Sequence, residues 1–134
     1  MIKILLCCGG GFSSSALCSK LHKEILENNM ENDYSIEFSS FDLAKNKISE
    51  FDILVCCPHL KYDAVNMIKT LKPTKPIYIL PPKMYGRINF KELAFDVIDA
   101  IDLYNKTQKN PVSFPGEENT LKITRYVAYR NSNL

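Results

Sequence analysis

The feature that most constrains the fold is a short, continuous apolar run at residues 2–8, IKILLCC, which glycines end at once. A strand exposed on one face alternates apolar and polar residues, whereas a strand buried on both faces does not need to. A second run of this kind, DILVCC at residues 52–57, is stopped by Pro58. Two such strands predict a sheet that is covered by helices on both faces.

Helical patterns separate these runs. Between residues 13 and 29, apolar positions recur at helical spacing with charged residues opposite them. By the same criteria we expect strands at 34–39 and 76–80 and helices at 42–49, capped by Asp42, at 60–71 and at 89–106. Alternating strands and helices imply right-handed crossovers. The predicted fold is therefore α/β, a three-layer, open, four-stranded parallel sheet with helices on both faces.

Composition excludes several classes of function. The 134 residues are enough for one domain, with 46% hydrophobic residues, 24% charged residues and a net charge of +2. We find no basic stripe, so we expect no nucleic-acid or membrane-surface binding. No segment approaches the roughly 18–20 apolar residues of a membrane span. Gly9–Gly11 and Ser13–Ser15 interrupt the apolar start, which argues against a secretory leader.

The five cysteines include two adjacent pairs, Cys7–Cys8 and Cys56–Cys57. Neighbours in a strand point to opposite faces, so neither pair predicts a disulfide framework. The sequence has no C-x-x-C and only two histidines, so we expect no metal site. Most of these cysteines, Cys18 included, are interpreted as small buried hydrophobes in a reducing cytoplasm.

The segment CGGGFSSS, residues 8–15, connects the first strand to the first helix. A helix N-terminus offers unpaired N–H groups to an anion, and glycines let successive amides turn inward as a phosphate nest. The same amides would stabilise a cysteine thiolate at the end of the strand. The segment predicts a phosphate-binding loop (P-loop) that holds a phosphoryl group on sulfur; a tight turn beside a buried cysteine is the simpler alternative.

Two familiar phosphate loops can be compared with this segment. The Walker pattern is absent, because no Lys-Ser or Lys-Thr closes the loop. Low-molecular-weight tyrosine phosphatases have a similar layout but carry an arginine where this chain has Ser14. Without that guanidinium, a transferring phosphate is poorly stabilised by this chain alone. The loop is therefore expected to hold a phosphoryl group rather than to hydrolyse its ester.

The chain resembles the IIB components of the lactose/cellobiose (chitobiose) family of the bacterial sugar phosphotransferase system. The resemblance rests on CGGGFSSSAL after the first strand, PHLKY at 58–62 and MYGRIN at 84–89. It spans residues 1–106 and leaves a C-terminal extension at 107–134. It matches Cys8 to the phosphorylated position. The implied phosphate-binding residues are Gly9, Gly10, Gly11, Phe12, Ser13, Ser14 and Ser15.

The resemblance implies a cytoplasmic phosphocarrier. Such a protein accepts a phosphoryl group from a phosphohistidine of the IIA component and passes it to a sugar bound by the membrane component IIC. It is thus a protein-phosphohistidine–sugar phosphotransferase, often grouped with kinases, and we expect a monomer without a cofactor. Two alternatives are a low-molecular-weight cysteine-type phosphatase and a non-catalytic regulatory module on the same fold.

Five residues after the third and fourth strands are candidates for the rim of the site or for partner contacts: Pro58, His59, Tyr62, Tyr85 and Gly86. His59 could contact the phosphoryl group or make a local hydrogen bond. For either tyrosine, core packing is almost as good an explanation. In the extension, residues 108–119 are expected to be a linker. The apolar alternation over 121–129 predicts either an added strand or a disordered tail.

Overall fold

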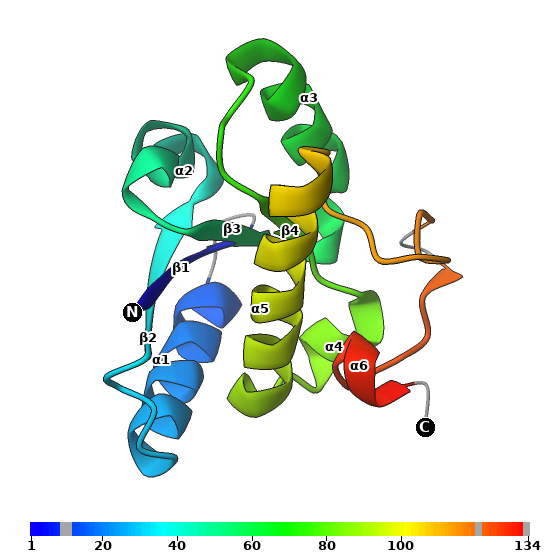
Figure 1. Ribbon diagram of the computed structural model, residues 1–134. Helices are drawn as coiled ribbons and strands as arrows, with labels where there is room; N and C mark the ends of the chain where they lie inside the picture. The colour runs from blue at the N-terminus through cyan, green and yellow to red at the C-terminus, as the bar shows by residue number, and fades with distance from the viewer. Residues whose placement is uncertain (9–11, 120–121, 133–134) are drawn as a thin grey trace.

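The computed structural model describes residues 1–8, 12–119 and 122–132, and at residues 8 and 12–15 it describes the backbone alone. Its centre is a four-stranded sheet in the order β2-β1-β3-β4 with every neighbouring pair parallel (Figure 1). The strands are β1 (Ile2–Cys8), β2 (Tyr34–Ser40), β3 (Ile53–Cys56) and β4 (Ile77–Ile79). The predicted parallel sheet is confirmed.

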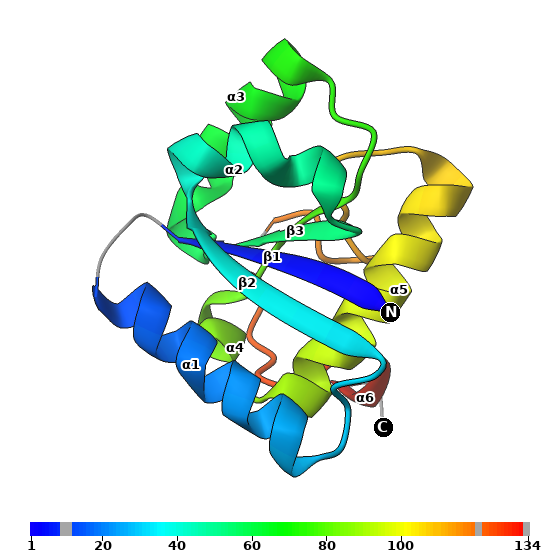
Figure 2. The same cartoon turned by 90° about the vertical axis from the view of Figure 1, so that its left-hand side faces the viewer.

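Helices lie on both faces of this sheet (Figure 2). Side chains of α1 and α5 share one apolar core with the sheet, and those of α2 and α3 share the other. The longer helices are α1 (Phe12–Glu27), α2 (Phe41–Lys47), α3 (Lys61–Leu71) and α5 (Phe90–Thr107). Short ones are α4 (Pro82–Gly86), α6 (Tyr129–Ser132) and the 3₁₀ turns η1 (Ile48–Glu50) and η2 (Pro58–Leu60). The predicted three layers are confirmed.

The continuous apolar run of β1 is explained by its two buried faces. Ile4 and Leu6 belong to the core beneath α1 and α5, whereas Leu5 and Cys7 belong to the core beneath α2 and α3. All four are completely shielded from solvent. Because successive side chains in a strand point to opposite faces, the same seven-residue strand packs against both layers of helices.

One predicted helix cap is wrong. Ser40, rather than Asp42, precedes α2, and its hydroxyl accepts a hydrogen bond from the Leu43 N–H at 3.5 Å. Ser40 has the extended backbone of an N-cap because it is also the last residue of β2. Asp42 therefore lies in the first turn, where its charge still favours the helix dipole.

The C-terminal extension runs first along the outer edge of β4. The Val112 N–H donates to the Ile77 carbonyl at 2.8 Å, and the Ile77 N–H donates to the side-chain oxygen of Asn110 at 2.8 Å. Asn110 also donates from its amide nitrogen to the Lys75 carbonyl at 2.9 Å. These three bonds occupy backbone groups that a fifth strand would need.

The strand expected over residues 121–129 does not form in its described part. Residues 122–128 contain no strand, and α6 follows them, while Leu121 lies outside the described residues. The segment is nevertheless anchored, because Ala128 is fully buried and the Arg125 side chain is only 6% exposed. The apolar alternation therefore reflects packing on the domain rather than pairing in the sheet.

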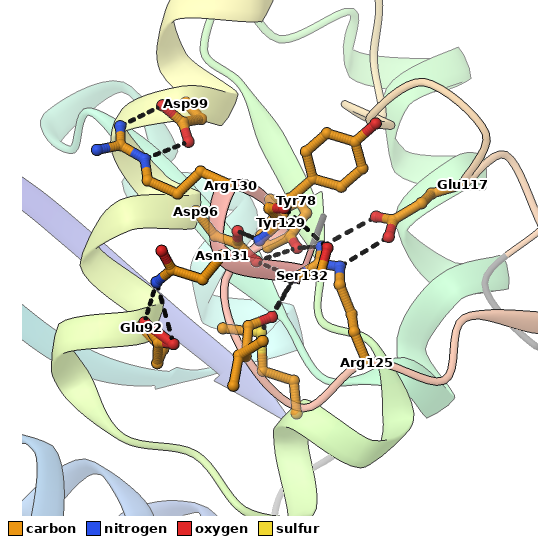
Figure 3. A network of polar contacts seen from close by, with 12 residues as sticks. Tyr78, Glu92, Asp96, Asp99, Glu117, Arg125, Tyr129, Arg130, Asn131 and Ser132 are labelled. Atoms are coloured by element: carbon orange, nitrogen blue, oxygen red, sulfur yellow. Dashed lines mark hydrogen bonds and ion pairs between the residues drawn. The ribbon is translucent and has the colours of Figure 1, made fainter. Parts of the chain in front are cut away.

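Arg125 joins the extension to β4 and α5 (Figure 3). Its guanidinium donates to Asp96 at 2.8 Å, to the Tyr78 hydroxyl at 2.9 Å and to Glu117 at 2.7 Å. The buried Asp96 carboxylate also accepts from the Tyr78 hydroxyl at 2.6 Å and from the Tyr129 N–H at 2.8 Å. Charged groups of this kind are tolerated inside a protein only when they are paired and hydrogen-bonded.

Among the described residues, no helix combines the length and the apolar character that crossing a bilayer requires.

Candidate functional site

The carboxyl ends of the strands meet at one edge of the sheet because all neighbouring pairs are parallel. β1 connects through α1 to β2 on one side, and β3 connects through α3 to β4 on the other. The strand order therefore reverses between β1 and β3, which is the position where open parallel sheets bind their ligands. The three predicted site segments follow β1, β3 and β4 and thus share this edge.

Cys8 is the last residue of β1 and pairs with Ser40 of β2. The 16-residue helix α1 begins at Phe12, so its N-terminal turn contains residues 12–15 of the predicted loop. Gly9, Gly10 and Gly11 lie outside the described residues, and so do the side chains of Cys8 and of Phe12, Ser13, Ser14 and Ser15. Their binding to phosphate stays a prediction.

Cys7 and Cys56 are buried thiols rather than nucleophiles. The two are direct partners in the pairing of β1 with β3, and both belong to the core beneath α2 and α3. Burial, with a smaller contribution from the charge of Asp42, raises the pKa of Cys7 to about 12. Burial also raises the pKa of Cys56 well above its ordinary value, with Cys7 and Asp63 adding to the effect. The structural interpretation of Cys7 is confirmed.

The other two described cysteines differ from each other. Cys18 is a buried thiol in the core beneath α1, where burial and then Glu37 raise its pKa. Cys57 is fully buried and disulfide-bonded, which the sequence interpretation did not anticipate. Alternation along a strand excludes a bond within an adjacent pair, but it does not exclude a bond between neighbouring strands.

Two of the predicted rim segments contact each other. The rings of His59, in η2, and Tyr85, in α4, meet edge to face with their centroids 6.4 Å apart. Tyr85 also packs against the core beneath α5, so it links the rim to the interior. Gly86 is exposed, and a Cβ added there would meet nothing within 4 Å. Its glycine is therefore not required by crowding.

Tyr62 has a different environment from Tyr85. It lies in the first turn of α3 with 81% of its surface exposed, so core packing does not explain it. Pro58, four residues earlier, is half-buried and is the first residue of η2. An exposed aromatic ring at the edge of a candidate site suits a contact with a partner protein.

The chain has three arginines, and each has structural partners. Arg87 stacks over Tyr126 at 5.3 Å from the ring centroid. Arg125 is enclosed by Asp96 and Glu117, and Arg130 binds Asp99 at 2.6 Å. The strong acceptors around Arg125 raise its pKa, although burial alone would lower it. The arginines thus maintain the fold and its extension. None of them stands at position 14, where the phosphatase loop has an arginine and this chain has a serine.

Residues 3–94 match the family model for the lactose/cellobiose-specific IIB subunit of the phosphotransferase system. The chain belongs to this family. A solved structure of the cellobiose-specific IIB component from Borrelia burgdorferi has the same fold, with 24% identity and a TM-score of 0.59 over 84% of this chain and 96% of that one. A lactose-specific IIB domain from Streptococcus pneumoniae aligns at 11% identity and a TM-score of 0.47, over 81% and 98% of the two chains. No curated protein sequence matches this IIB chain significantly.

The match to the family ends before the extension begins, so the family does not explain the Arg125 cluster or α6. The cluster is the main feature that sequence reasoning missed. A single arginine among alternating apolar residues is the signal that could have indicated it, because a charge on an apolar side of a segment needs a partner. Asp96 gave no such signal, because the sequence pattern places it on the charged face of the predicted last helix, whereas the structure buries it completely.

Proposed function

We propose that this IIB protein is a cytoplasmic phosphocarrier whose Cys8 accepts a phosphoryl group from a phosphohistidine of IIA and passes it to a sugar bound by IIC. The observation that carries the proposal is the position of Cys8. It ends β1 beside the point where the strand order reverses, and the N-terminus of α1 follows it. Family membership supports the same role.

In the first step, the Cys8 thiolate attacks the phosphorus atom of the phosphohistidine. A phosphorus–sulfur bond forms while the phosphorus–nitrogen bond breaks, and the imidazole leaves. In the second step, a sugar hydroxyl attacks the same phosphorus, its proton is lost, and the Cys8 thiolate is released. Both are in-line transfers in which alignment of donor, phosphorus and acceptor contributes most to the rate.

The residues around Cys8 have defined parts in this scheme. The amides of Gly9–Gly11 and the hydroxyls of Ser13–Ser15 hold the phosphoryl oxygens, aided by the positive end of α1. Each partner supplies further charge stabilisation, because this chain offers serine rather than arginine at position 14. The His59–Tyr85 contact and the exposed Tyr62 border the docking surface.

The test is phosphoryl transfer from a phosphorylated IIA component to the reduced protein. We expect stable incorporation of one phosphate that thiol-directed reagents prevent, and complete loss of incorporation in Cys8→Ala. Cys18→Ala is the matched control and should accept phosphate normally. Incorporation that survives Cys8→Ala would assign the acceptor elsewhere, and none in the wild type with several IIA donors would favour a regulatory module.

The phosphatase alternative requires a separate measurement. A cysteine-type phosphatase releases phosphate from aryl phosphates continuously and without a partner, whereas a carrier does not. We expect no steady release by the reduced protein alone. Sustained turnover that is lost in Cys8→Ala would replace the carrier by the phosphatase.

A further inference from the structure

The pairing of β1 with β3 aligns two pairs of cysteines across the centre of the sheet. Cys7 and Cys56 are direct partners, and the Cys57 N–H donates to the Cys7 carbonyl at 3.1 Å. Cys57 keeps an extended backbone after the end of β3, so the register continues by one residue. The position that Cys57 faces in β1 is therefore that of Cys8.

This arrangement suits a disulfide bond. Neighbouring strands lie about 4.8 Å apart, within the range of roughly 4.4–6.8 Å that disulfides require between Cα atoms. Cys57 is disulfide-bonded, whereas Cys7, Cys18 and Cys56 are free thiols. Of the five cysteines, Cys8 is the one whose strand position faces Cys57 in the register, although its side chain lies outside the described residues. We propose that Cys8 and Cys57 form a reversible disulfide, an oxidative modification site at the phosphoryl acceptor.

The oxidant we assign to this reaction is a peroxide. The Cys8 thiolate attacks one oxygen of hydrogen peroxide, the O–O bond breaks, and Cys8 becomes a sulfenic acid with release of hydroxide. The Cys57 thiol then displaces the sulfenic oxygen, giving the disulfide and one water. A dithiol reverses the reaction by exchange: it is oxidised to its own disulfide while both cysteines recover their protons.

The two cross-strand pairs, Cys7 with Cys56 and Cys8 with Cys57, differ in their capacity for this chemistry. Cys7 and Cys56 are just as close in register, but burial raises their thiol pKa values, so few thiolates are present to attack an oxidant. Cys8 ends its strand in front of the N-terminus of a long helix, which favours a thiolate. The consequence for transport rests on the proposed function: a protein oxidised at Cys8 has no thiolate to accept phosphate.

The first arm of the test is peptide mapping and does not depend on phosphoryl transfer. The full chain is treated with hydrogen peroxide, free thiols are blocked, and the protein is digested with trypsin without reduction. We expect peptide 4–20 joined to peptide 48–61, a product that dithiothreitol removes. The link should be absent in Cys57→Ala and in Cys8→Ala and present in Cys56→Ala and Cys7→Ala. No link in the wild type, or a link that survives Cys57→Ala, overturns the proposal.

The second arm measures incorporation of phosphate from phosphorylated IIA before and after peroxide. The oxidised wild type should lose phosphate incorporation and regain it after dithiothreitol. Oxidised Cys57→Ala should also lose phosphate incorporation, without forming the link, and should regain less of it after dithiothreitol. Equal recovery of both proteins would show that Cys57 does not protect Cys8. A wild-type link without any phosphate incorporation in the reduced state would contradict the carrier function and leave the disulfide established.

Discussion

A cysteine is reactive as a thiolate, and burial decides which cysteines of this chain can ionise. Burial raises the thiol pKa values of Cys7 and Cys56. Cys7 lies next to the proposed acceptor, yet its side chain enters the core beneath α2 and α3, where its pKa is about 12. At mildly alkaline pH, a thiol with that pKa is ionised in only about one molecule in ten thousand. Sequence adjacency therefore does not give the two cysteines similar chemistry.

We predict that iodoacetamide, at mildly alkaline pH and under reducing conditions, modifies Cys8 well before Cys7 or Cys56. Fragmentation of the tryptic peptides distinguishes the sites. Since burial causes the difference, denaturant should make all five cysteines react at similar rates. Rapid modification of Cys7 in the folded protein would show that its thiol is more accessible than its complete burial indicates.

The exposed ring of Tyr62 allows a test of the docking surface. Tyr62→Ala should leave the free energy of unfolding within about 0.5 kcal/mol of the wild type, as for most exposed positions. It should slow phosphoryl transfer with IIA or with the sugar-loaded IIC. Thr70→Ala, on the same helix, is the control variant and should affect neither transfer. Unchanged rates with both partners would place the docking surface away from α3.

Among the secondary-structure elements, the strands and long helices could be predicted because their apolar side chains face the cores and their charged side chains mostly face solvent. Residues shielded on both faces of a sheet tolerate no charge, so β1 and β3 were evident from the uncharged runs at residues 4–7 and 53–56, while Lys3 of β1 is exposed. The candidate acceptor followed from the residues after β1. The His59–Tyr85 contact could not be predicted, because it depends on the short helix α4, which begins at the second of two prolines. The Cys57 disulfide could not be predicted either, because it depends on the register between strands.

The strand that was one of two alternatives for residues 121–129 is absent from its described part for a related reason. Apolar alternation predicts a strand only where a sheet edge can receive it, and residues 110–112 already occupy the edge of β4. The segment around Arg125 instead packs toward α5, because the buried Arg125 guanidinium pairs with Asp96 there. The local sequence pattern indicates neither the occupied edge of β4 nor the partner of Arg125.

The buried pair Asp96–Arg125 gives a prediction for α5. Arg125→Met leaves a buried carboxylate without its cation, so the free energy of unfolding should fall by about 3–5 kcal/mol. The double variant Asp96→Asn/Arg125→Met should recover part of this loss, because it removes the unpaired charge. Chemical denaturation of the wild type, both single variants and the double variant measures the coupling. Additive losses would mean that the two residues act independently.

The pH dependence of this loss has a definite sign. Burial raises the pKa of Asp96, while Arg125 and the hydrogen bonds from Tyr78 and Tyr129 lower it. Without Arg125 the folded-state pKa rises further, so the folded protein binds a proton more tightly than the unfolded chain. The stability of Arg125→Met should therefore decrease as pH rises above the usual carboxyl range, and adding Asp96→Asn should remove that decrease. An equal loss at acidic and neutral pH would contradict this account.

For the whole molecule, the sheet, α1 and the rim segments are complete before the extension begins. A chain ending at residue 107 should still accept phosphate on Cys8. It should be less stable than Arg125→Met, since it also loses the buried Val112 and Phe114. Adding Asp96→Asn to the shortened chain should restore part of its stability. Complete loss of Cys8 phosphorylation in a folded, shortened chain would show that the extension takes part in transfer.

The bonds from Asn110 and Val112 to β4 have a consequence for how copies of the protein behave in a crowded solution. A parallel sheet with a bare outer strand presents a row of backbone donors and acceptors that can template pairing with another chain. Here the Ile77 N–H and carbonyl are both taken within the same molecule. The extension thus occupies this edge of the sheet, which disfavours edge-to-edge pairing with another copy on that side.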